Sequence, residues 1–112
     1  MDGHSLTRLA DEHLAIAGDH GSGRSAVTVH GGREHHLRQT LIALAGGRSL
    51  GEHESPGEAT LQVLRGRVTL HAGGEQWSGG PGDFLLIPPQ RHDLEAIEDA
   101  AVLLTVANRL AD

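Results

Sequence analysis

The sequence predicts an all-β domain, a sandwich or barrel of short strands, preceded by one short helix. Seven strand-like segments follow one another at spacings of about eight to twelve residues, which is typical of antiparallel sandwiches and barrels. Glycine- or proline-bearing turns separate these segments, and the chain contains 16 glycines and 4 prolines. Strands alternating with long helices, which would indicate a parallel α/β sheet, are not predicted.

The length of the chain limits the number of domains that it can form. A chain of 112 residues fits a single domain, because chains of this size bury one core. Its 38% apolar and 21% charged residues are ordinary for a folded globular protein. We assign residues 1–24 to an N-terminal helix and linker, and residues 25–112 to the β domain.

Residues 6–17 predict a short amphipathic helix, because apolar residues recur there at three- and four-residue spacing. Ser5 is the expected N-cap and Gly18 the expected C-terminal stop. We expect this helix to pack on the outside of the domain.

The strands are predicted from apolar and β-branched runs between turn signals. They cover residues 26–30, 37–45, 60–64, 67–72, 84–87, 93–97 and 101–106. Gly66 and Gly82 are expected to take positive φ in tight turns. The side chains of a strand alternate between its two faces, so Ala59, Leu61 and Val63 share one face. If that alternation continues back through the preceding turn, His53 also faces the interior.

Composition excludes several kinds of chemistry. The chain has no cysteine, hence no thiolate nucleophile or thiolate metal site, and no lysine, hence no Schiff base. A net charge of −6 and one Trp, one Phe and no Tyr argue against direct nucleic-acid binding. We expect no membrane span and no signal peptide, and therefore a cytoplasmic protein.

Two stretches carry a family resemblance. Residues 51–66, GEHESPGEATLQVLRG, and residues 79–92, GGPGDFLLIPPQRH, resemble the two motifs of the cupins. His53 and Gly66 match the first motif, and Gly82, Pro88 and His92 match the second. Where the family has its second histidine, its glutamate and its asparagine, this chain has Ser55, Ala59 and Ala96. The resemblance implies a double-stranded β-helix, or jelly-roll, barrel.

In the cupins, three histidines and a glutamate hold a divalent iron, manganese, nickel, copper or zinc ion. The resemblance therefore makes His53 and His92 candidate metal ligands. Two ligands hold a metal weakly, because catalytic sites normally use at least three. The candidates for a third ligand are Glu58 or Glu54 near the turn, and Gln39 or His36 from the region of residues 36–45. The alternative is that the two histidines line a pocket without metal.

Our first hypothesis is a barrel that binds a small organic ligand or metabolite. The expected pocket comprises His53, Ser55, Leu61, Val63, His92 and Leu94. A second hypothesis, implied by the resemblance, is a metal-dependent dioxygenase, isomerase or decarboxylase. The third is a structural or partner-binding barrel without room for a ligand. Because both faces of several strands are apolar, we also expect a homodimer.

Overall fold

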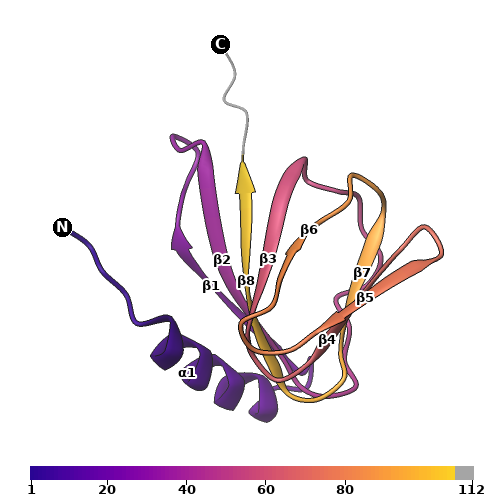
Figure 1. Cartoon of the computed structure of the whole chain (residues 1–112). Coiled ribbons are helices and arrows are strands. Elements are labelled where there is room, and N and C mark those ends of the chain that lie inside the picture. Colours follow the sequence, from indigo (N-terminus) through magenta and orange to yellow (C-terminus); the bar gives the residue numbers. More distant parts are fainter. Residues whose placement is uncertain (108–112) are drawn as a thin grey trace.

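A computed structural model describes residues 1–107 of the chain (Figure 1). In this part of the chain one helix precedes eight strands, so the predicted all-β class with a short N-terminal helix is confirmed. The elements are α1 (Leu6–Asp19), β1 (Arg24–His30), β2 (Leu37–Leu44), β3 (Glu58–Arg65), β4 (Val68–Ala72), β5 (Glu75–Gly79), β6 (Phe84–Leu86), β7 (His92–Ala96) and β8 (Ala100–Ala107). The predicted β domain extends to residue 112, and its last five residues lie outside the described residues.

The strands form two sheets. The larger sheet has the order β1-β2-β8-β3-β6 and the smaller one the order β5-β4-β7. Residues 47–53 extend the smaller sheet along β7, where the backbone N–H of Leu50 donates to the carbonyl oxygen of Leu94 at 3.0 Å. All pairings within the sheets are antiparallel. The result is an open jelly-roll sandwich rather than a closed barrel (Figure 1).

One strand of the structure, β5, is not among the strands predicted from the sequence. Its residues, EQWSG, include a single large apolar residue, Trp77, so the alternation that reveals a half-buried strand is nearly absent. The strand forms because Gly73 and Gly74 both have positive φ, +56° and +84°, and close a tight hairpin with β4. The sequence predicts this turn, but not the strand that follows it.

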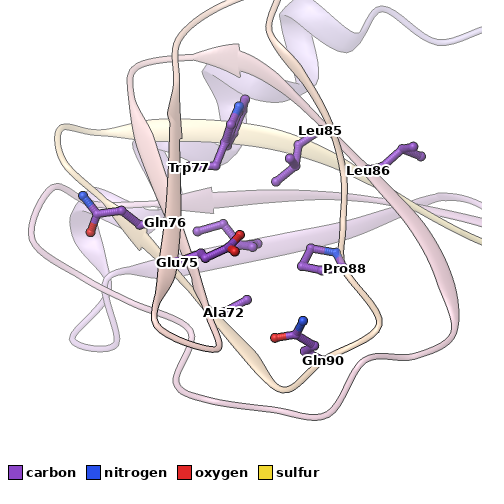
Figure 2. Close-up of a pocket in the computed structure, with 9 residues that line it drawn as sticks. Ala72, Glu75, Gln76, Trp77, Leu85, Leu86, Pro88 and Gln90 are labelled. Atoms are coloured by element: carbon purple, nitrogen blue, oxygen red, sulfur yellow. The ribbon is translucent and has the colours of Figure 1, made fainter.

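The two sheets separate at one edge of the sandwich, between β5 and β6. These are the terminal strands of the smaller and the larger sheet, and they are not paired with each other. A solvent-open pocket of about 230 Å³ lies there (Figure 2). Its walls come from β4, β5, β6 and the turn that follows β6.

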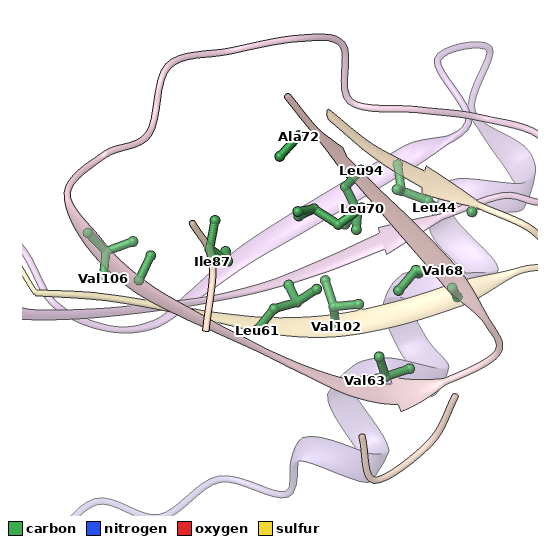
Figure 3. Packing of buried hydrophobic residues seen from close by; sticks show 13 residues of the cluster. Leu44, Leu61, Val63, Val68, Leu70, Ala72, Ile87, Leu94, Val102 and Val106 are labelled. Atoms are coloured by element: carbon green, nitrogen blue, oxygen red, sulfur yellow. The ribbon is translucent and has the colours of Figure 1, made fainter. Parts of the chain in front are cut away.

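The core lies between the sheets. The inward face of β3, with Ala59, Leu61 and Val63, is buried, which confirms the predicted alternation. They belong to one cluster with side chains of the smaller sheet, and Figure 3 labels Leu61 and Val63 of β3 together with Leu70 and Leu94. Gly66 and Gly82 take positive φ, +71° and +89°, as predicted.

Helix α1 lies on the outside of the domain, as predicted, and packs on the outer face of the larger sheet. Its Ala10 is fully buried against Leu41 of β2 and Ala101 of β8. The predicted stop at Gly18 is wrong by one residue, because the helix ends at Asp19 and the N–H of His20 still reaches the carbonyl oxygen of Ala17. None of the described helical structure is long and apolar enough to cross a membrane.

Helix α1 covers one of the apolar strand faces on which the homodimer prediction was based. The second apolar face of β2 and β8 is covered by α1, so it does not need a second subunit. On β6, beyond the helix contacts, Phe84 and Leu86 are 59% and 68% exposed. The homodimer stays a prediction.

The start of α1 provides a test of local stability. The Ser5 hydroxyl oxygen accepts a hydrogen bond from the backbone N–H of Arg8 at 3.2 Å. Ser5→Ala removes this cap and is expected to lower the free energy of unfolding by about 1 kcal/mol, whereas Ser5→Asp, another good N-cap, should retain most of it. Urea denaturation followed by far-UV circular dichroism measures both, and equal losses in the two variants would contradict the capping role.

Candidate functional site

The two histidines matched by the cupin-like motifs are neighbours. His92 begins β7, and His53 lies on the segment that extends the smaller sheet beside it. Each donates its backbone N–H to the other's carbonyl oxygen at 2.9 Å. Their ring centroids are 4.4 Å apart with an interplanar angle of 70°. The sequence-predicted pair is therefore brought together, with His92 buried and His53 exposed.

Both rings are held in the same way by the backbone. Nδ1 of His53 lies 2.9 Å from the carbonyl oxygen of Gly51, and Nδ1 of His92 lies 2.8 Å from that of Gln90. A carbonyl oxygen can only accept, so each Nδ1 carries the proton. In the neutral rings each Nε2 then has a free lone pair. Within residues 1–107 neither Nε2 has a hydrogen-bond partner.

A small cavity adjoins this histidine pair. Its volume is about 40 Å³, which is room for a few water molecules and less than a pocket for a drug-sized ligand needs. Apart from the two histidines, its lining is apolar. The lining residues are Ile42, Leu50, His53, Pro56, Leu61, Leu70, Ile87, His92, Leu94 and Leu104.

Four of the six predicted pocket residues line this cavity: His53, Leu61, His92 and Leu94. Ser55 and Val63 do not. The Ser55 hydroxyl donates instead to the carbonyl oxygen of Gly57 at 3.1 Å, within its own turn. Val63 faces inward as predicted, but it is fully buried in the core further along β3.

The candidates for a third metal ligand lie elsewhere. Gln39 shares the face of Leu41, which α1 covers, and its side chain donates to the Thr105 hydroxyl at 3.3 Å. Glu58 is exposed at the start of β3, on the face opposite to Leu61, and His36 is exposed before β2. None of them lines the cavity.

Glu54 is engaged with a neighbouring cation. Its carboxylate pairs with Arg91 at 3.0 Å on the surface. Across residues 1–107 no group of three or more His, Cys, Asp or Glu residues could hold a metal ion.

Comparison with known proteins agrees with the motifs. A family model described as a cupin domain matches residues 40–107, more than half of the chain. The chain belongs to the cupin family. A search of curated proteins finds no match.

Solved cupin-like structures share this fold. A conserved protein of unknown function from Streptococcus pyogenes is 26% identical, with a TM-score of 0.72 over 82% of this chain and 80% of that one. An RmlC-like cupin protein from Desulfovibrio desulfuricans is 23% identical, with a TM-score of 0.70 over 96% of both chains. A mutant of salicylate 1,2-dioxygenase from Pseudoaminobacter salicylatoxidans is 19% identical, with a TM-score of 0.71, over 89% of this chain and 32% of that one.

Cupins often bind transition metals, and the side chains present here do not fit a tightly held one. The donors are two neutral imidazoles, one short of the three protein ligands that catalytic sites normally use. Ala59, at the position of the family's glutamate, turns its methyl group toward the core and is 3% exposed. This cupin therefore keeps the histidine pair without the rest of the ligand set.

Sequence reasoning missed the larger pocket at the β5–β6 edge. Trp77, Glu75 and Gln90 line it, and none of them was a candidate site residue. The available signal was Trp77 itself, the only tryptophan of a chain with no tyrosine, placed two residues before Gly79.

Proposed function

We propose that this cupin domain binds a small organic ligand at the cavity beside His53 and His92, without a resident metal. The observation that supports this proposal is the orientation of the two rings. Backbone carbonyl groups fix both Nδ1 atoms, which leaves the Nε2 lone pairs of two residues that line an apolar cavity without a partner among residues 1–107. Such a pair accepts hydrogen bonds from a ligand that carries a hydroxyl or N–H group.

The size of the cavity limits what enters it. A cavity of about 40 Å³ accommodates the polar end of a ligand, but not a whole metabolite. His53 and Pro56 lie nearer the surface than buried His92, so the remainder of the ligand would lie over these two residues at the mouth. His92 would then contact the end of the ligand that enters furthest.

A second candidate function is a metal-dependent enzyme. It is favoured by the fixed tautomer, because metal-binding histidines commonly donate their other ring nitrogen to a backbone carbonyl group. The likeness to salicylate 1,2-dioxygenase supports only the fold at 19% identity. This hypothesis needs at least one further protein ligand besides the two rings.

Phenol and anisole test the binding proposal, since they share an aromatic ring and only phenol has a hydroxyl donor. We expect phenol to shift the ring NMR signals of His53 and His92 in the uniformly ¹⁵N-labelled protein. Anisole should bind about fivefold more weakly, which corresponds to one lost hydrogen bond of about 1 kcal/mol. The same spectra should show the Nδ1–H tautomer for both rings.

His92→Ala should abolish the difference between phenol and anisole. His71→Ala is the matched control, because His71 is exposed and pairs with Glu95 at 3.3 Å on the outer face of the smaller sheet. Equal affinities for phenol and anisole in the unchanged protein would contradict the proposal.

Metal content separates the two candidate functions. In untagged protein we expect far less than one equivalent of any transition metal by elemental analysis, unchanged in a His53→Ala, His92→Ala double variant. Close to one equivalent of a single metal, lost in the double variant, would overturn the metal-free proposal and favour the enzyme.

A further inference from the structure

A pocket opens between the two sheets at the β5–β6 edge, and it is separate from the histidine cavity. Its volume is about 230 Å³. Leu70 lines both spaces and forms part of the wall between them. Figure 2 shows Trp77 and Gln90 at opposite ends of the pocket, with Glu75 and Pro88 between them.

Strand pairing directs two side chains of β5 into this pocket. Trp77 pairs with Leu70 and Glu75 pairs with Ala72, and paired residues of antiparallel strands share a face. That face is the inward one, since Leu70 and Ala72 are buried in the core. Trp77 and Glu75 therefore follow each other along the inner face of the terminal strand.

The indole of Trp77 is supported on one side. A Cβ atom at Gly79 would collide with the six-membered ring of Trp77, so the ring lies directly against the glycine backbone. Any side chain at position 79 would displace the ring. The glycine thus holds an aromatic surface in place at the pocket wall.

The charge of the pocket is negative. Glu75 is the only charged residue in its lining, and within residues 1–107 no arginine or histidine forms an ion pair with it. Glu75 is exposed, so a neutral apolar ligand would remove only part of the water around its carboxylate, but that loss is unfavourable when nothing replaces it. A cation would compensate it.

We propose that the Trp77 pocket binds a small organic cation, of the methylated ammonium class. The indole face attracts a cation through its quadrupole, and Glu75 neutralises the charge. Methyl groups suit the apolar walls of Leu70, Leu85 and Pro88. The side-chain hydrogen-bond acceptors of the lining belong to Glu75, Gln76 and Gln90. This proposal does not depend on the function proposed for the histidine pair.

Choline chloride is the probe, and the fluorescence of Trp77, the only tryptophan, is the readout. We expect a saturable change with a midpoint in the range of about 1–10 mM, as for other ligands of this size. The uncharged isostere 3,3-dimethyl-1-butanol should bind about tenfold more weakly, and sodium chloride at equal ionic strength should give no saturable change.

Glu75→Gln keeps the shape of the side chain and removes its charge. It should weaken choline binding about tenfold and leave the binding of the isostere unchanged. Glu34→Gln is the matched control, because Glu34 is an exposed residue between β1 and β2 that does not line the pocket. Calorimetry should show that Trp77→Leu no longer binds choline, with far-UV circular dichroism to check that this variant is folded.

Three results would each overturn the proposal. They are equal affinities for choline and its isostere, unchanged choline binding in Glu75→Gln, and the absence of a saturable signal up to about 100 mM choline, far above the expected midpoint. His53→Ala separates the two sites, since it should leave choline binding intact whether or not the histidine cavity binds a ligand.

Discussion

Replacing Gly66 by alanine is expected to destabilise the domain by about 2–5 kcal/mol, the largest effect we predict for a single methyl group. Gly66 has a φ of +71°, which costs an L-residue about 1–2 kcal/mol. A Cβ atom there would also lie 2.9 Å from the Cα atom of Ala100 and closer still to the carbonyl group of Asp99. Because these neighbours are backbone atoms at the start of β8, relief requires a strand to move, at a further cost of about 1–3 kcal/mol.

Gly82→Ala is the matched control for this prediction. Gly82 has a φ of +89°, but nothing lies within 4 Å of the position of its Cβ atom. Only the backbone cost of about 1–2 kcal/mol is therefore expected. Urea denaturation of both variants measures the difference, and equal losses would show that the approach of β8 does not determine the requirement for glycine at position 66.

Leu61→Ala is expected to lower the free energy of unfolding by about 3 kcal/mol. Leu61 is 2% exposed at the centre of β3 and packs in the core between the sheets. Removing its isobutyl group loses the transfer free energy of the buried carbons and leaves a void that the surrounding strands fill only in part.

The matched control is Leu86→Ala on β6, where the leucine is 68% exposed. It should change stability by less than about 0.5 kcal/mol. Urea denaturation of both variants is the measurement. A similar loss at the two positions would mean that the Leu86 side chain is covered in solution, as it would be in the predicted homodimer.

The sequence was sufficient for most of the fold because the strands of the core alternate clearly. Ala59, Leu61 and Val63 were placed on one face by position alone, and all three are buried. Alternation does not place Gln39, which was named as a candidate third ligand. Both faces of β2 are apolar, because one faces the core and the other lies under α1. The sequence alone therefore does not show which face of β2 points to the core.

The candidate site was predicted only in part. His53 and His92 carry recognisable motifs, and their contact across the sheet follows from strand pairing. Ser55 was counted with them because of its spacing, yet its hydroxyl is used within a local turn. The Trp77 pocket forms because β5 and β6, the terminal strands of the two sheets, do not pair with each other. This is a property of the whole sandwich, and local sequence patterns do not predict it.

The position of β8 also constrains when the protein can fold during synthesis. β8 is the last described strand, and in the larger sheet it lies between β2 and β3, which do not pair with each other. Until residues 100–107 leave the ribosome, β1–β2 and β3–β6 are separate strand pairs with their inner edges unpaired. Such edges are open to pairing with other chains. Completion of the sheet, and hence of the Leu61 core, must follow translation of these last strand residues.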